Sequence, residues 1–76
     1  MNRDVFMQGL AQALEWTGPG LSEGTLLQGD SHWDSMGRVA TMLFLDADLG
    51  VTVTDEQLEH VSTVADVLAL VDDRLQ

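Results

Sequence analysis

The stretch WDSMGRVATMLFLDADLG, residues 33–50, contains the start, the body and the end of one helix. Asp34 and Ser35 are both N-cap residue types, whose side-chain oxygens accept hydrogen bonds from the free N–H groups of a first turn. Gly50 stands where a C-cap glycine is expected. We therefore predict a helix that begins at Asp34 or Ser35 and ends near Leu49. Its expected buried stripe consists of Met36, Val39, Ala40, Leu43 and Ala47.

Helical periodicity also precedes this stretch. A first helix is predicted from about Arg3 to Trp16, with Asn2 as its candidate N-cap. The run Gly18-Pro19-Gly20 is expected to stop it, because proline cannot continue a helix and glycine lets the chain turn. Apolar residues at helical spacing predict a buried face for it made of Val5, Phe6, Leu10, Ala13 and Leu14.

Two further helices are predicted after Gly50. The segment Val51–Val53 is an extended connector, since three residues without a partner strand do not make a sheet. Thr54–Gln57 is a capping box that opens a short helix ending near His60, and Thr63–Asp66 is a second start signal. The last helix has a strong apolar stripe made of Val64, Val67, Leu68, Val71 and Leu75.

The connection from Thr17 to about Trp33 is long for a small domain, so apolar residues must hold it against the helices. Leu21, Leu26 and Leu27 are expected to do so. The predicted fold is all-α: three main helices, one short helix and a long first loop, packed as a small bundle over a single domain, residues 1–76.

Composition narrows the classes of partner. The chain has 76 residues, no cysteine and a formal net charge of −10, which makes nucleic acid and anionic membranes poor partners. Its hydrophobic fraction of 45% is typical of a globular protein. The N-terminus lacks a targeting segment, and no apolar run approaches the ~20 residues of a membrane span. We expect a cytoplasmic, free-standing monomer whose acidic surface either meets basic protein patches or serves solubility.

The densest polar cluster, Asp30–Ser35, lies where the loop meets the second predicted helix. A helix N-terminus offers unpaired N–H groups and a partial positive charge, and both stabilise a phosphate placed there. Ser35 is therefore well placed to carry a phosphodiester. By spacing alone, Ser35 and Asp34 also fit the role of ordinary N-caps.

Asp34-Ser35-Met36 resembles the Asp-Ser-Leu motif of acyl and peptidyl carrier proteins. The resemblance continues through residues 46–53 and 58–67, and it covers the chain from about Leu26 to Leu75. It implies an acyl-carrier-like four-helix bundle in which Ser35 bears 4′-phosphopantetheine from coenzyme A. The thiol of that arm would hold biosynthetic intermediates as thioesters, and the protein itself would not be an enzyme. The cargo stays open among an acyl chain, an amino acid and a small hydroxy acid.

The resemblance also implies partner contacts. Asp34 would flank the modification site, and Met36, Arg38 and Val39 would meet partner proteins. The implied partners are a phosphopantetheinyl transferase, an acyl- or aminoacyl-loading enzyme and downstream synthase enzymes. Fatty-acid carriers have many acids on this helix, whereas here Arg38 is expected to place a positive charge on the recognition face. We therefore expect a specialised polyketide or nonribosomal-peptide pathway, with primary fatty-acid synthesis as the alternative.

Three other interpretations remain. A hydrolase would pair Ser35 with His32 and with Asp30 or Asp34, but the first glycine of a nucleophile elbow is replaced by tryptophan. A calcium site would use oxygen ligands from Asp46, Asp48 and either Glu56 or Glu59, although the spacing does not match an EF-hand loop. A helical interaction module without a prosthetic group shares every fold feature with a carrier. The two histidines, His32 and His60, are expected to be exposed; Trp16 and Trp33 are expected to be packing anchors, and Met7 and Met42 core residues.

Overall fold

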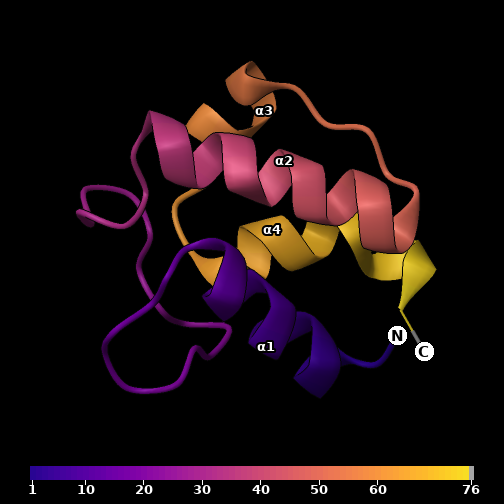
Figure 1. Cartoon of the computed structure of the whole chain (residues 1–76), viewed down its shortest axis with the longest axis horizontal. Helices are drawn as coiled ribbons and strands as arrows, with labels where there is room; N and C mark the ends of the chain where they lie inside the picture. Colours follow the sequence, from indigo (N-terminus) through magenta and orange to yellow (C-terminus); the bar gives the residue numbers. More distant parts are fainter. Residues whose placement is uncertain (76) are drawn as a thin grey trace.

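The computed structural model describes residues 1–75, which form four α-helices and a closing 3₁₀ turn (Figure 1). The elements are α1 (Arg3–Ala13), α2 (Ser35–Leu49), α3 (Asp55–Glu59), α4 (Val64–Val71) and the 3₁₀ turn Asp72–Arg74. Within the described residues the only β-type pairing is an isolated bridge between Leu26 and Thr63. The predicted all-α class, with three longer helices, one short helix and a long first connection, is confirmed.

All four helices contribute to one buried core. The predicted stripe of α4 is confirmed: its four valine and leucine members within the helix are buried, and the fifth, Leu75, packs beside the core beyond the 3₁₀ turn. The long connection adds two core side chains of its own, Leu27 and Trp33. The buried apolar residues are Phe6, Leu10, Leu14, Leu27, Trp33, Leu45, Val53, Leu58, Val61, Val64, Val67, Leu68 and Val71.

Helix α1 ends earlier than predicted, at Ala13 rather than at Trp16. Glu15 adopts a left-handed conformation with φ of 52°, the N–H of Trp16 donates to the carbonyl of Ala11 at 2.9 Å, and that of Glu15 donates to Gln12 at 3.1 Å. These two bonds make a Schellman motif. The motif normally uses glycine, so a glutamate in its left-handed position gave no signal in the sequence.

For the first helix, the predicted N-cap is confirmed and one predicted core residue is wrong. The side chain of Asn2 accepts a hydrogen bond from the N–H of Val5 at 2.9 Å, so the predicted N-cap is confirmed. Val5 itself was expected in the buried face and is exposed, whereas Phe6, Leu10 and Leu14 are buried there. The buried face is therefore narrower than the pattern indicated.

The buried face of α2 differs from the predicted one. Met36, Val39 and Leu43 are exposed, with 80%, 47% and 65% of their surface accessible, and Ala47 is exposed as well. The residues that face the core are Gly37, Thr41 and Leu45. The hydroxyl of Thr41 donates to the carbonyl of Gly37 at 2.9 Å, so this polar side chain is buried without an unmet hydrogen bond. A pattern that counts glycine and threonine as polar selects the wrong face.

The contact between α1 and α2 explains a glycine inside a helix. A Cβ atom on Gly9 would lie 2.5 Å from the ring of Phe44. That ring also packs against Phe6, with centroids 5.6 Å apart. Gly9 costs about 1 kcal/mol relative to alanine as a helix former, and in return the two helices approach closely.

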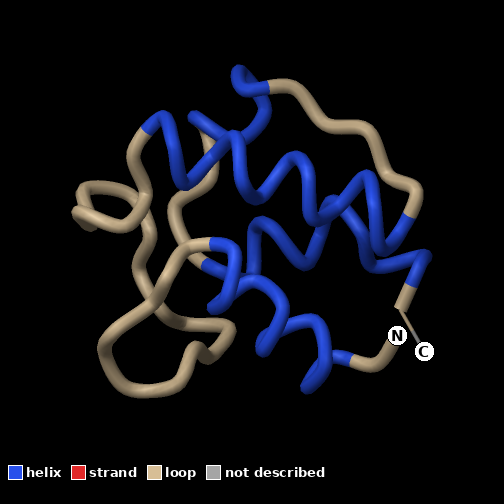
Figure 2. Tube along the Cα trace, in the orientation of Figure 1, coloured by secondary structure: helices blue, strands red, loops and turns tan. Residues whose placement is uncertain are grey.

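The long connection between α1 and α2 is fastened to the start of α4 (Figure 2). The N–H of Leu27 donates to the carbonyl of Ser62 at 2.8 Å, and the N–H of Val64 donates to that of Thr25 at 3.1 Å. Leu27 is fully buried and Leu21 half-buried, as predicted for residues that hold the loop, whereas Leu26 points outward and is exposed.

The predicted caps that end α2 and begin α3 and α4 are confirmed. Gly50 ends α2 with φ of 67°, and Thr54 and Gln57 form the reciprocal capping box of α3. Before α4, the carboxylate of Asp66 accepts hydrogen bonds from the N–H groups of Ser62 and Thr63 at 2.9 and 3.2 Å. These bonds favour the ionised form and hold the pKa of Asp66 below its ordinary value.

Candidate functional site

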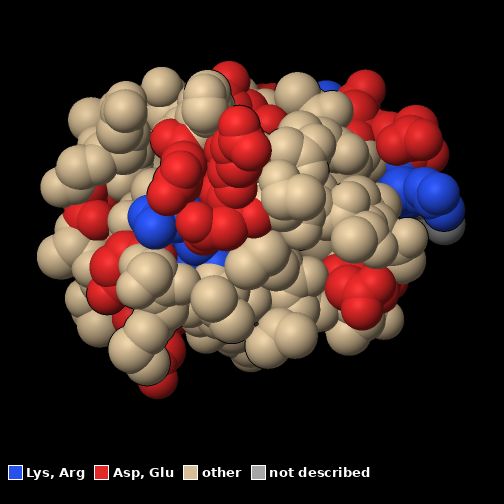
Figure 3. Space-filling model, turned by 90° about the horizontal axis from the view of Figure 1, so that it is seen from above, with Lys and Arg blue, Asp and Glu red and all other residues tan. Residues whose placement is uncertain are grey.

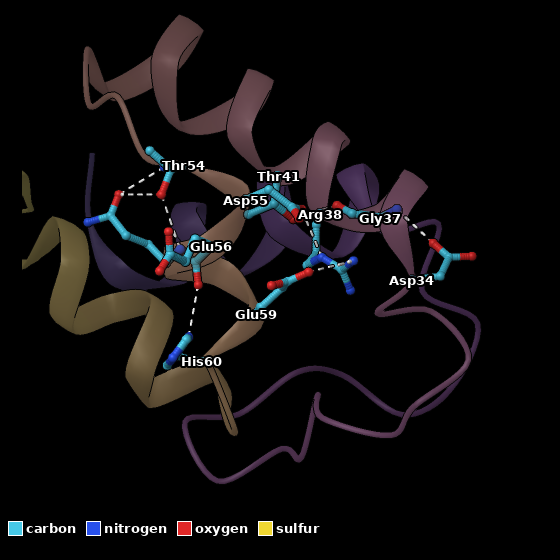
Figure 4. Close-up of polar contacts among 10 residues, drawn as sticks. Asp34, Gly37, Arg38, Thr41, Thr54, Asp55, Glu56, Glu59 and His60 are labelled. Carbon is cyan, nitrogen blue, oxygen red and sulfur yellow. Dashed lines mark hydrogen bonds and ion pairs between the residues drawn. The ribbon is translucent and has the colours of Figure 1, made fainter.

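Ser35 is the first residue of α2, and its side chain is exposed. The residue before it, Asp34, has extended backbone angles and caps the helix: its Oδ1 accepts a hydrogen bond from the N–H of Gly37 at 2.8 Å (Figure 4). Because Asp34 supplies the cap, the hydroxyl of Ser35 is not needed for that purpose. By helix geometry the N–H groups of Ser35 and Met36 have no partner within the helix.

The first turn of α2 lies in close contact with the loop that precedes it. A Cβ atom on Gly37 would overlap the backbone carbonyl oxygen of His32 and would lie 3.1 Å from Cδ2 of Leu14. Glycine is thus the residue that lets the loop and the end of α1 close on the start of α2. This role was missed in the sequence, where the available signal was a glycine inside a predicted helix.

A polar cluster holds the loop in place before Ser35. Oδ1 of Asp30 accepts a hydrogen bond from the backbone N–H of His32 at 2.8 Å and lies 2.6 Å from its Nδ1. The backbone bond, followed by the side-chain bond, keeps the pKa of Asp30 below its ordinary value. Nε2 of His32 lies 3.2 Å from the hydroxyl of Thr17, and the ring packs at a tilt of 39° against Trp16, with centroids 4.5 Å apart.

This arrangement corrects the expected exposure of His32 and bears on the hydrolase interpretation. His32 is half-buried, and its two ring nitrogens contact Asp30 and Thr17 rather than Ser35. The serine and histidine that a hydrolase would pair are therefore not brought together as a nucleophile and its base. His60, in contrast, is exposed at the end of α3, as predicted.

The two tryptophans are packing residues, as predicted, whereas the two methionines predicted for the core lie only at its margin. Trp33 is buried in the core, and its Nε1 has no hydrogen-bond partner among the described residues. Trp16 packs against the core, and its Nε1 donates to the carbonyl of Pro19 at 2.7 Å. Met7 and Met42 are half-buried at the margin of the core.

Two hollows lie at the start of α2, and Ser35 lines the smaller of them. The smaller is an apolar groove of about 320 Å³ on the exposed face of α2, lined by Ser35, Met36, Val39, Ala40 and Leu43. The larger is a cleft of about 530 Å³ between the end of α1 and the start of α2, with residues of the preceding loop in its wall. Met36 and Ala40 line both hollows, so the groove and the cleft meet next to Ser35.

Arg38 does not present the free positive charge expected from the sequence. Only 18% of its side chain is accessible; its Nε lies 2.9 Å from Oδ1 of Asp55, and its Nη2 lies 3.8 Å from Oε1 of Glu59 (Figure 4). Both acids belong to α3, so the ion pairs tie α3 to α2. The face seen in Figure 3 carries several groups of acidic side chains, with smaller areas of basic surface beside two of them.

The charge reversal Arg38→Glu is therefore expected to destabilise the fold. It removes two ion pairs and places three carboxylates together, which we estimate to cost about 1–2 kcal/mol. Urea denaturation measures the effect, and Arg38→Met, which keeps the aliphatic packing, is expected to lose less. The double variant Arg38→Glu/Asp55→Arg should recover part of the loss. An unchanged unfolding midpoint in Arg38→Glu would show that these pairs contribute nothing.

Two further features of the described residues bear on the calcium interpretation and on membrane spanning. Among residues 1–75, no group of three or more histidine, aspartate and glutamate side chains is arranged to hold a metal ion, so the acids considered for calcium do not converge. None of the helices in that range combines the length and the apolarity needed to cross a bilayer.

Comparison of the chain with models of known protein families, with curated proteins and with solved structures finds no match.

Proposed function

We propose that this protein is a carrier whose Ser35 bears a covalent 4′-phosphopantetheine group. The observation that carries the proposal is the exposed hydroxyl of Ser35 at the first position of α2, inside an Asp-Ser-Met sequence similar to the carrier motif. The four helices and the long first connection agree in order and relative length with an acyl-carrier-like bundle.

The residues around Ser35 fit an attached phosphodiester. The N-terminus of α2 stabilises negative charge, and the N–H groups of Ser35 and Met36 point toward that end of the helix. The carboxylate of Asp34 is turned to the N–H of Gly37, so its negative charge is engaged in the cap. The arm would supply a terminal thiol, a group that the cysteine-free chain does not have.

The exposed apolar face of α2 supports the second half of a carrier's work, which is docking to enzymes. Met36, Val39 and Leu43 form a continuous strip beginning next to Ser35. Exposed apolar strips bordered by polar residues mark protein interaction sites. Such a strip would dock the transferase that loads the arm and the loading and synthase enzymes that use it.

The feature of α2 that favours a specialised pathway is its apolar strip rather than the charge of Arg38. Arg38 is paired with acids of α3, so its charge is not the feature that sets this helix apart. The distinguishing feature is the apolar strip, which ends where the acids Asp46 and Asp48 begin. We propose dedicated partner enzymes with a complementary apolar patch, in a specialised polyketide or nonribosomal-peptide pathway. Service in primary fatty-acid synthesis is the alternative.

The test is to incubate the unmodified protein with coenzyme A and a promiscuous phosphopantetheinyl transferase and to measure the intact mass. The expected result is a gain of one phosphopantetheine unit, which Ser35→Ala abolishes. Ser31→Ala is the matched control, because Ser31 is also an exposed loop serine close to the site, and it should load like the wild type. A wild-type chain that gains no mass would favour a helical interaction module, which the apolar strip of α2 also supports.

A further inference from the structure

Met36 is the one side chain of the exposed strip on α2 that an oxidant can readily modify. Its side chain has 80% of its surface accessible and lines the groove beside Ser35. The other residues that line the groove are serine, valine, alanine and leucine, whose side chains do not react readily with peroxides. Because the unloaded chain has no cysteine, no thiol competes with methionine sulfur for such an oxidant. An accessible sulfur therefore lies next to the residue that we propose to be loaded.

The other methionines are less accessible. Met1, Met7 and Met42 are half-buried and pack against the hydrophobic core. A side chain that solvent reaches is also reached by a dissolved oxidant, so Met36 should react before Met7 and Met42. The exposure of Met36 also separates its oxidation from damage to the fold, because a sulfoxide there adds no polar atom to the core. Oxidation of Met42, in contrast, would place a polar oxygen at the margin of the core.

The reaction needs only dissolved hydrogen peroxide as the oxidant. The lone pair of the Met36 sulfur attacks one peroxide oxygen, so that the S–O bond forms while the O–O bond breaks. The departing hydroxide takes the proton of the transferred oxygen and leaves as water; sulfur is oxidised by two electrons and the peroxide is reduced by the same two. The product is methionine sulfoxide, which is polar and chiral, and a separate reductase for each of its two epimers returns it to the thioether. In that return step two thiols become a disulfide and the oxygen leaves as water.

A sulfoxide at Met36 opposes docking on the strip. Its oxygen accepts hydrogen bonds from water, and an apolar partner surface that covers it cannot replace them. Val39 and Leu43 supply the rest of the strip, and neither side chain has a donor for that oxygen. The hydrogen bond from the N–H of Gly37 to Asp34 is not involved in the reaction, so the start of α2 keeps its cap. The modification thus changes what the strip can bind and leaves the helix start in place.

From these observations we propose that Met36 is a reversible oxidation site that controls the loading of Ser35. The thioether form docks the transferase, and the sulfoxide form does not dock it until a reductase has acted. This inference rests on the proposed function, because it concerns the same strip and the same transferase. The arm brings a thiol to a chain that has none. Oxidation of Met36 would therefore prevent a new oxidisable thiol from being added to the protein while peroxide is present.

The test treats the unloaded protein with hydrogen peroxide, removes the peroxide with catalase and measures the sulfoxide at each methionine by peptide mass spectrometry. Loading by the promiscuous transferase is then measured as kcat/KM, together with the thermal unfolding midpoint. We expect sulfoxide to form first at Met36 and kcat/KM to fall by about tenfold or more. The unfolding midpoint should change little, and treatment with the two reductases should restore loading. An effect through the fold would instead lower the midpoint together with the rate.

Two variants isolate the contribution of Met36, and each is compared with its own untreated form. Met36→Leu supplies the leucine of the Asp-Ser-Leu motif and has no sulfur to oxidise. Met42→Leu removes a sulfur from the margin of the core by a swap that nearly conserves volume. Peroxide should leave the loading rate of Met36→Leu where it was before treatment, whereas Met42→Leu should lose as large a factor as the wild type.

The outcomes separate the two proposals. An untreated chain that gains no mass with coenzyme A overturns the carrier assignment and, with it, the oxidation site. For a chain that does load, the oxidation site alone is overturned if Met7 or Met42 reacts as fast as Met36. It is also overturned if complete oxidation of Met36 leaves loading unchanged, or if peroxide slows the loading of Met36→Leu as much as that of the wild type.

Discussion

Gly37→Ala is expected to be the most damaging single-methyl change near the candidate site. The added Cβ would overlap the carbonyl oxygen of His32, which is a backbone atom and cannot rotate away as a side chain can. Either the loop or the first turn of α2 has to move, and overpacking of this kind costs about 2–3 kcal/mol. A domain of this length has a total stability of roughly 4–11 kcal/mol, so the loss is a large share of it.

Urea denaturation measures this loss, and glycines elsewhere in the loop provide a matched control. A Cβ on Gly24 meets nothing within 4 Å, and its backbone is not left-handed. Gly24→Ala should therefore leave stability unchanged or raise it slightly, by restricting the unfolded chain. If Gly37→Ala and Gly24→Ala unfolded at the same urea concentration, the close contact between the loop and α2 would not exist as described.

Met36→Ser is expected to lower the rate at which a transferase loads Ser35 by tenfold or more. Met36 is the most exposed large apolar residue of the strip and lies next to Ser35. Truncation of a hot-spot side chain at the centre of an interface costs about 2 kcal/mol or more, and about 1.4 kcal/mol already corresponds to a tenfold change. Because the side chain of Met36 is exposed in the free protein, the substitution should change the stability of the protein little.

The matching measurements are kcat/KM for loading, followed by mass spectrometry, and the thermal unfolding midpoint. Leu26→Ser is the control, since Leu26 is a similarly exposed apolar residue on the long connection rather than on α2. It should load at the wild-type rate. Equal loading of the wild type, Met36→Ser and Leu26→Ser would mean that the strip is not the docking surface of the transferase.

Much of the fold could be predicted because its signals are local. Helix periodicity located α4, and side-chain caps located the starts of α1, α2 and α3 within a residue. The early end of α1 could not be predicted, because a glutamate takes the left-handed position that glycine usually marks. The left-handed conformation of Glu15 depends on tertiary packing around the loop, and a short stretch of sequence carries no information on that packing.

The candidate site shows the same division. The place of Ser35 at a helix start follows from the sequence of its own turn, and so does the capping role of Asp34. The orientation of α2 does not, because it depends on a close contact at Gly37 and on a buried hydroxyl at Thr41. The strip predicted to be core is consequently the exposed strip beside Ser35. The ion pairing of Arg38 with α3 could not be predicted from the sequence either, because its partner Asp55 lies 17 residues away in the chain.

The central claim is that Ser35 carries the arm, and mass spectrometry of the protein isolated from its native cells tests it most directly. Fragmentation of the purified chain should place one phosphopantetheine group on the peptide that contains Ser35, either with a free thiol or with a thioester cargo whose mass identifies it. Protein in which Ser35 is unmodified throughout, or in which the group lies on another residue, would contradict the account.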